Sequence, residues 1–255
     1  MRAGSRAWRR WPMSTAKGVD VSTWQHPNGA AIDWERVLDA GYVFVIAKVT
    51  QGTSYVNPWA LRDIEDAQAA GLLVGAYHFF EAGAEPGLQA KHFYTQLVGQ
   101  KLDLGYWLDW EPGPMENYQA SAQYNAFMVV MEEVSPSCGV YCDLSHYEAL
   151  KQVNVDIHRL WLADYSTEPK LGELVWQDSQ TGTVPGIAAP VDVDVLTSTR
   201  GLNIPTAPPA RPTAATTHAV TLEDEPEEVP PSPDEPPSPS SPPPSRDESS
   251  STPEP

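Results

Sequence analysis

The segment YWLDWEP (106–112) ends in two carboxylates, Asp109 and Glu111, that flank a tryptophan. Side chains alternate along an extended strand, so both carboxylates point to one face while Leu108 and Trp110 point to the other. Like charges about 6 Å apart repel by roughly 2.8 kcal/mol at an effective dielectric constant near 20, which is about two pKa units. We therefore expect one of the two acids to remain protonated near neutral pH. A protonated acid beside an ionised one is what the cleavage of a glycosidic bond requires.

Further acids lie on other segments of strand character. Asp20 lies in GVDVS (18–22), and Asp192 and Asp194 alternate with valines in VDVDVL (191–196). A single acid at a strand end usually caps a helix or a turn, and we assign that role to Asp194. The convergence of four acids on one end of a set of strands is better explained by catalysis. The candidate catalytic residues are Glu111, Asp109, Asp20 and Asp192.

Polar and aromatic residues on the neighbouring strands supply the other half of a sugar site. Lys48 shares a strand face with Thr50; if that face points inward, Lys48 holds Asp109 ionised and leaves Glu111 as the acid. Aromatic rings stack on the apolar faces of sugars. Most aromatic residues are expected in the core, but four residues near strand ends are candidates for substrate binding: Tyr77, Tyr141, Tyr165 and Lys48.

Eight segments rich in β-branched and aromatic residues can position these side chains: 18–22, 43–50, 72–80, 105–111, 138–143, 160–165, 174–179 and 191–196. The first four connections have the apolar spacing of helices. Strand followed by helix, repeated, predicts parallel βαβ units. The last two connections are short and contain Pro and Gly. The sequence therefore predicts an α/β, TIM-like barrel that loses its helices toward its last strands.

Composition divides the chain into three parts. Residues 203–255 hold 16 of the 26 prolines and little apolar material, so we expect a disordered acidic tail rich in Pro, Ser and Glu. We expect residues 1–16 to be a basic, disordered segment. Its stretch RAWRRWP (6–12) is either a membrane-active arm or, as we prefer, a stretch upstream of a true start at Met13. Residues 17–202 are long enough for one domain with a sizeable core.

Charge, hydropathy and cysteine content exclude several classes of protein. A net charge of −18 argues against nucleic-acid binding. The sequence has no apolar run long enough for a membrane span, nor the apolar core of a usual secretory signal. Cys138 and Cys142 would lie about 13 Å apart in a strand, beyond disulfide reach, so we expect free thiols. Neither a metal nor a cofactor is expected.

The segments KGVDVSTWQ, IDWERVLDAGYVFVIAKVTQGTSYVNP, AQAAGLLVGAYHFF, YWLDWEP, LWLADY, VWQDSQTG and VDVDVL resemble, in order, those of glycoside hydrolase family 25, the Chalaropsis-type lysozymes. The resemblance implies a barrel of five βα units followed by three strands that lack regular helices. It also implies a muramidase that hydrolyses the β-1,4 bond between N-acetylmuramic acid and N-acetylglucosamine. In this resemblance Glu111 is the proton donor, Asp109 completes the Asp-x-Glu motif, and Asp20 and Asp192 match the acids of the first and last strands. Many members have Asn where this chain has Asp194.

The resemblance leaves two mechanisms open, a covalent intermediate or assistance by the 2-acetamido group of the substrate. It implies a monomer acting on bacterial peptidoglycan, outside the cell or at a host wall after release, without nucleic acid or stable membrane insertion. A phage lysin released through a holin and a secreted bacterial enzyme are both compatible with it. The alternatives are a related hexosaminidase such as a chitinase, a non-catalytic glycan-binding barrel, and a structural protein whose tail is the functional part.

Overall fold

A closed barrel of eight strands forms the body of the protein in the computed structural model, which describes residues 15–113, 115, 117–135, 138–200 and 202. The strands of the ring are β1 (Ala16–Val21), β2 (Tyr42–Gln51), β4 (Leu73–Phe79), β5 (Gly105–Asp109), β6 (Gly139–Asp143), β7 (Leu160–Ala163), β8 (Val175–Gly182) and β9 (Val191–Leu196). Each pairs with its neighbours, and β1 pairs with both β2 and β9 to close the ring. The short β3 (Tyr55–Val56) forms a hairpin with the end of β2.

The last strand runs against all the others in the ring. The pairings from β1 through β8 are parallel, whereas β9 is antiparallel to both β8 and β1. The N-terminal end of β9 therefore lies beside the C-terminal end of β1, with Asp192 directly opposite Asp20. This reversal brings the acids of the last strand to the end of the barrel at which the parallel strands finish.

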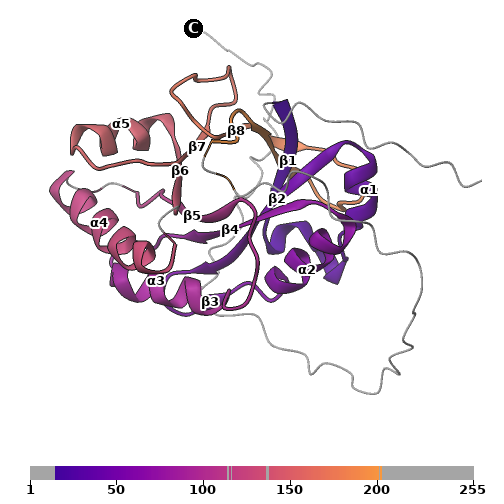
Figure 1. The fold of residues 1–255 in the computed structure, drawn as a ribbon, viewed down its shortest axis with the longest axis horizontal. Helices are drawn as coiled ribbons and strands as arrows, with labels where there is room; N and C mark the ends of the chain where they lie inside the picture. Colours follow the sequence, from indigo (N-terminus) through magenta and orange to yellow (C-terminus); the bar gives the residue numbers. More distant parts are fainter. Residues whose placement is uncertain (1–14, 114, 116, 136–137, 201, 203–255) are drawn as a thin grey trace, which may run out of the picture. The chain divides into compact units, whose positions relative to one another are not determined.

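Five helices accompany the first strands (Figure 1): α1 (Trp34–Asp39), α2 (Ala60–Ala70), α3 (Pro86–Thr95), α4 (Asn117–Val134) and α5 (Leu144–Gln152). Two short 3-10 turns, η2 (Thr23–Gln25) and η3 (Pro27–Gly29), follow β1. Asp33 and Asp143 cap α1 and α5 by accepting backbone N–H groups. Gly71 ends α2 in the left-handed region at a φ of 99°, which a side chain would disfavour. The predicted order of five βα units followed by three strands is confirmed.

Two apolar layers hold the barrel together, one on each face of its wall. Along β2, Phe44 and Ile46 belong to the inner layer and Val45 and Ala47 to the outer one, as strand alternation requires. The inner layer is filled by large aromatic side chains, Tyr77, Trp107, Tyr141 and Trp161. The outer layer packs the strands against Val37, Ile64, Phe93, Phe127 and Leu150 of the five helices. The interior of the barrel is therefore a packed core, and the side chains at the C-terminal ends of the parallel strands lie at one end of this core.

A bulge in β2 changes one sequence prediction. Lys48 points to the interior of the barrel, opposite Tyr77 of β4. The pairing with β4 then shifts by one residue between Lys48 and Thr50. Thr50 then makes a 2.8 Å hydrogen bond with His78, whose ring packs on Phe93 and Phe127 of the outer layer. The expectation that Lys48 and Thr50 share a face is therefore wrong, because the extra residue of the bulge reverses the alternation.

The limits of the domain and its cysteines follow from the described residues. Ala16 is already part of β1 and buried, so the barrel begins before Lys17. Residues 1–14, which include Met13, and the tail 203–255 lie outside the described residues. The expectations about these two segments stay predictions.

Cys138 and Cys142 are buried free thiols, and burial raises the pKa of Cys138 to about 12. None of the helices described has the length and apolar character needed to cross a bilayer.

Candidate active site

The acid pair of the sequence lies where β5 ends. Asp109 is the last residue of the strand and is 7% exposed, whereas Glu111 lies two residues further on and is open to solvent. Trp110 between them turns to the outer layer, where its ring packs 4.6 Å from Phe80 and 5.6 Å from Tyr124 between centroids. The prediction that Leu108 and Trp110 point to the face opposite Asp109 is confirmed. The burial of Trp110 anchors the segment that carries the two acids.

The acids of the first and last strands meet across the β1–β9 pairing. Asp20, 6% exposed, lies opposite the partly buried Asp192, and Asp194 lies opposite Gly18. Asp194 is completely buried, and its Oδ1 accepts a 2.8 Å hydrogen bond from Nε1 of Trp161. It caps neither a helix nor a turn, contrary to the sequence expectation, because the alternation of β9 turns it toward the core of the barrel.

Gln177 on β8 links the acids to two of the predicted tyrosines. Its Nε2 donates a 2.8 Å hydrogen bond to Oδ2 of Asp20, and its Oε1 accepts from the hydroxyls of Tyr141 and Tyr165, both at 2.9 Å. Gln177 is not among the site residues predicted from the sequence. The signal was available, because Gln177 is a polar side chain two positions after the buried Val175 and therefore on the inward face of its strand.

Lys48 and Tyr77 complete the set of predicted residues at this end of the barrel. They face each other in the β2–β4 register. Lys48 donates a 2.8 Å hydrogen bond to Gln51 and lies 4.7 Å from the centroid of the Phe79 ring. Tyr77 packs edge-on against Trp161 at 6.0 Å in the interior. The barrel thus brings all eight predicted site residues, Glu111, Asp109, Asp20, Asp192, Tyr77, Tyr141, Tyr165 and Lys48, to one end.

Burial and mutual repulsion raise the pKa values of these acids, so the cluster as a whole holds protons that its members share. Burial, followed by Glu111, raises the pKa of Asp109 well above its ordinary value. Lys48 lowers the pKa of Asp109, as expected from the sequence, but burial and Glu111 together outweigh it. Burial, reinforced by Asp192, likewise raises the pKa of Asp20, which the hydrogen bond from Gln177 opposes.

The two more accessible acids are shifted in the same direction. Burial and then Asp143 raise the pKa of Glu111, while His146 lowers it. Burial and the charge of Glu111 raise the pKa of Asp192 to about 6. The cluster therefore retains protons in a pH range in which isolated carboxyl groups are ionised, which is the state that acid catalysis needs.

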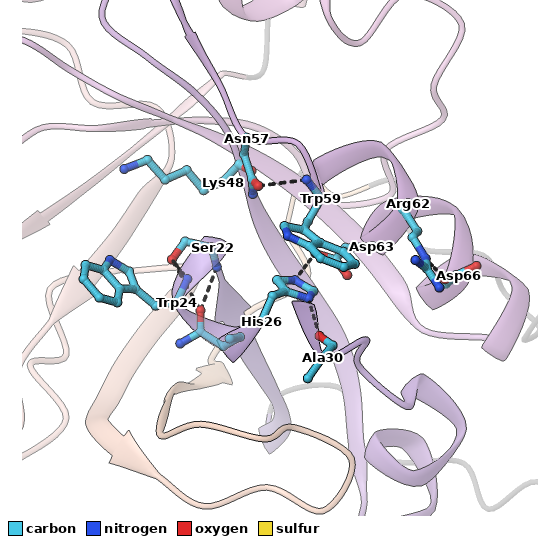
Figure 2. Close-up of polar contacts among 11 residues, drawn as sticks. Ser22, Trp24, His26, Ala30, Lys48, Asn57, Trp59, Arg62, Asp63 and Asp66 are labelled. Carbon is cyan, nitrogen blue, oxygen red and sulfur yellow. Dashed lines mark hydrogen bonds and ion pairs between the residues drawn. The ribbon is translucent and has the colours of Figure 1, made fainter. Parts of the chain in front are cut away.

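The side chain of His26 holds the loop after β1 through contacts with Trp59, Asp63 and Ala30, as Figure 2 shows. The ring of His26 stacks on Trp59 at 4.1 Å with an interplanar angle of 3°. Its Nδ1 lies 2.9 Å from the carbonyl oxygen of Ala30 and its Nε2 lies 2.8 Å from Oδ2 of Asp63. Trp24, on the same loop, leaves 64% of its surface exposed. These contacts of His26 with Trp59, Ala30 and Asp63 form the His26 brace. The brace fixes the loop that carries Trp24 and directly follows β1, the strand of Asp20.

Comparison with known proteins identifies the family. The model of the glycosyl hydrolases family 25 matches residues 19–187, about two thirds of the chain. The chain belongs to this family. It is therefore a glycosidase, and the resemblance inferred from the sequence is confirmed. The match ends before β9, so the family model does not include Asp192 and Asp194. Their position beside Asp20 comes from the pairing of β9 with β1.

Relatives within the family are similar in sequence and in fold. The chain is 27% identical over 182 residues to the autolytic lysozyme of Clostridium acetobutylicum, covering 70% of this chain and 55% of that protein. The bacterial lysozyme of Streptomyces coelicolor superimposes with a TM-score of 0.61 at 25% identity, over 72% of this chain and 93% of that one. A family 25 glycosyl hydrolase from Bacillus anthracis has a TM-score of 0.63 at 21% identity, over 77% and 95%.

Proposed function

We propose that this family 25 glycosidase is a muramidase, which hydrolyses the β-1,4 bond between N-acetylmuramic acid and N-acetylglucosamine in bacterial peptidoglycan. The similarity to lysozymes supports the substrate class. The observation that carries the chemistry is the end of β5, where an exposed Glu111 follows a buried Asp109 opposite two further acids. A proton donor and an ionised partner on one face are the requirements for glycosidic cleavage.

Glu111 is the general acid in this proposal. It is the more exposed acid of the pair. Burial and Asp143 favour its protonated form. Burial and Glu111 also raise the pKa of Asp109, and Lys48 opposes them, so the ionised Asp109 of this proposal is the form in which the coupled pair holds its proton on Glu111. Glu111 donates its proton to the oxygen of the breaking bond, and the ionised Glu111 then accepts a proton from the attacking water.

Asp109 acts on the anomeric side of the bond. Asp109 is largely buried, and its Oδ1 has no hydrogen-bond partner among the described residues, so no protein donor competes with the substrate for this oxygen. It can attack the anomeric carbon or accept the N–H of the 2-acetamido group, which are the two mechanisms left open by the sequence. The negative charges of Asp20 and Asp192 stabilise the positive charge that develops on the sugar ring.

Aromatic side chains contribute to sugar binding unequally. Tyr165 is 49% exposed and offers a ring face, as does Trp24 on the braced loop. Tyr77 and Tyr141 are each 8% exposed, so we propose that they contact the glycan only through an edge or a hydroxyl. Lys48 is partly buried and acts mainly through its charge on Asp109. Action on cell walls as a monomeric lysin is the setting that fits this chemistry.

Digestion of purified peptidoglycan tests the proposal. Wild type, Glu111→Gln and the matched control Glu133→Gln, an exposed glutamate on α4, are compared by mass spectrometry of the soluble fragments. New reducing muramic acid ends are expected from wild type and from the control, with at least a thousandfold loss in Glu111→Gln. Reducing glucosamine ends would refute the assigned bond. Wall binding without sugar release by any of the three proteins would instead favour the glycan-binding alternative.

A further inference from the structure

One carboxyl group at the end of the barrel has a partner on one oxygen only. Asp194 is 0% exposed, and its Oδ1 accepts the hydrogen bond from Trp161. Its Oδ2 is equally buried and meets no hydrogen-bond donor among the residues that the structure describes. Burial of a carboxylate oxygen without a hydrogen-bond donor costs free energy of folding. A proton on this oxygen avoids most of that cost.

The group that faces Asp194 is another acid. Asp20 and Asp194 lie on the paired strands β1 and β9, where Asp20 is opposite Asp192 and Asp194 is opposite Gly18. Hydrogen bonding between the two carboxyls lowers the pKa of Asp20 and raises that of Asp194. Asp192, on the same strand, also repels a charge on Asp194. Two neighbouring carboxylates that are both buried repel each other strongly when both are ionised, and a proton held by one of them relieves this repulsion.

The surroundings decide which of the two carboxyls holds this proton. Asp20 lies at the open end of the barrel and accepts a hydrogen bond from the amide of Gln177, whose Oε1 is held by two tyrosine hydroxyls. These contacts stabilise an ionised Asp20. Asp194 lies deeper and has only the neutral indole of Trp161 as a donor. Burial raises the pKa of Asp194 well above its ordinary value, and Asp20 adds to this shift.

We propose that Asp194 is a neutral carboxylic acid that donates a hydrogen bond from Oδ2 to Asp20 and thereby holds Asp20 ionised and in position. Asp194 touches no substrate in this arrangement and is a positioning residue. Its neutral state follows from the contacts of the folded chain alone. Its role in positioning rests on the proposed function, in which the charge of Asp20 assists bond cleavage.

The pH dependence of stability tests the neutral state without any substrate. An acid whose pKa is raised on folding keeps its proton in the native state after it has lost it in the unfolded state, so stability falls as the pH rises. Asp194→Asn supplies an amide donor and removes the titration. From about pH 4 upward, the unfolding equilibrium constant of wild type should rise tenfold per pH unit relative to that of Asp194→Asn, until Asp194 ionises in the folded state. A ratio that is constant from pH 4 to 7 would overturn the proposal.

Carbon-13 NMR of the aspartate carboxyl groups shows which acid carries the proton. At pH 7 the resonance that disappears in Asp194→Asn should have the shift of a neutral acid. The resonance that disappears in Asp20→Asn should have the shift of a carboxylate. Asp39→Asn, an exposed position at the end of α1, identifies the resonance of a solvent-exposed carboxyl group for comparison. The reverse assignment of Asp20 and Asp194 would contradict the proposal.

Activity on peptidoglycan tests the positioning role. Asp194→Asn keeps a donor toward Asp20, whereas Asp194→Leu fills a similar volume without one. We expect kcat/KM of Asp194→Asn to exceed that of Asp194→Leu at least tenfold, with both variants folded. Equal values would show that Asp20 needs no donor from this position. If wild type released no sugar, the muramidase proposal would fail, while the stability and NMR results would still decide the protonation of Asp194.

Discussion

Replacement of Gln177 by methionine tests the hydrogen-bond network that holds Asp20. Methionine has a similar length and fills the same space, but it neither donates to Asp20 nor accepts from the two tyrosine hydroxyls. Because Gln177 is itself buried, water cannot readily take its place. The change therefore removes three hydrogen bonds and little packing.

The expected loss of stability is the sum of three unequal contributions. Asp20 is buried and loses a charge-assisted hydrogen bond, at a cost of about 2 kcal/mol. The buried hydroxyl of Tyr141 loses a neutral acceptor, at a cost of about 1 kcal/mol. Tyr165 is half exposed, so its hydroxyl regains water at almost no cost. Gln177→Met should therefore lower the free energy of unfolding by about 3 kcal/mol, roughly a hundredfold in the equilibrium constant.

Urea unfolding followed by tryptophan fluorescence measures this loss at two pH values. The hydrogen bond from Gln177 lowers the pKa of Asp20, so it stabilises the ionised form. Its removal should cost most at neutral pH and less as the pH falls through the pKa of Asp20 in the folded state. Tyr165→Phe, which removes only the half-exposed contact, is the control and should cost less than about 0.5 kcal/mol. A loss in Gln177→Met no larger than in this control, or equal at both pH values, would refute the reasoning.

Two further substitutions test the surroundings of the acids. Lys48→Met removes the charge that lowers the pKa of Asp109, so the acidic limb of the pH profile of kcat/KM should move to higher pH; the exposed Lys91→Met should leave it in place. A profile that does not move would show that the ionisation of Asp109 does not limit activity. His26→Ala leaves Asp63 buried without its partner and should lower the free energy of unfolding by about 3 kcal/mol, as measured by urea unfolding. A loss below 1 kcal/mol would mean that the pair contributes little to the brace.

Strand alternation and connection length predicted much of this fold from the sequence. The alternation in YWLDWEP placed Asp109 inward and Trp110 outward, as the structure has them. The same rule failed for Thr50, because a bulge adds a residue that no local pattern announces. Alternation succeeds where the ladder is regular and fails where it is interrupted.

The direction of the last strand and the role of Gln177 required the tertiary structure. The connections 164–174 and 183–190 are both short and have no helix among the residues described. The first nevertheless joins parallel strands and the second antiparallel ones, so length alone could not separate them. The inward face of Gln177 is readable from its strand, but its bond to Asp20 joins residues 157 positions apart. Such contacts follow from closure of the barrel rather than from local pattern.

The closure of the ring by β9 also sets the order in which the acid cluster can be completed during synthesis. A growing chain emerges from its N-terminus, so Asp20, Asp109 and Glu111 are all available before β9 exists. Pairing β9 with β1 closes a loop of nearly the whole domain, which is entropically the most demanding contact of the ring. Until then Asp20 lacks its neighbours Asp192 and Asp194, and the barrel wall stays open beside it. A chain that ends before β9 therefore carries Asp109 and Glu111 without Asp192 and Asp194 beside Asp20.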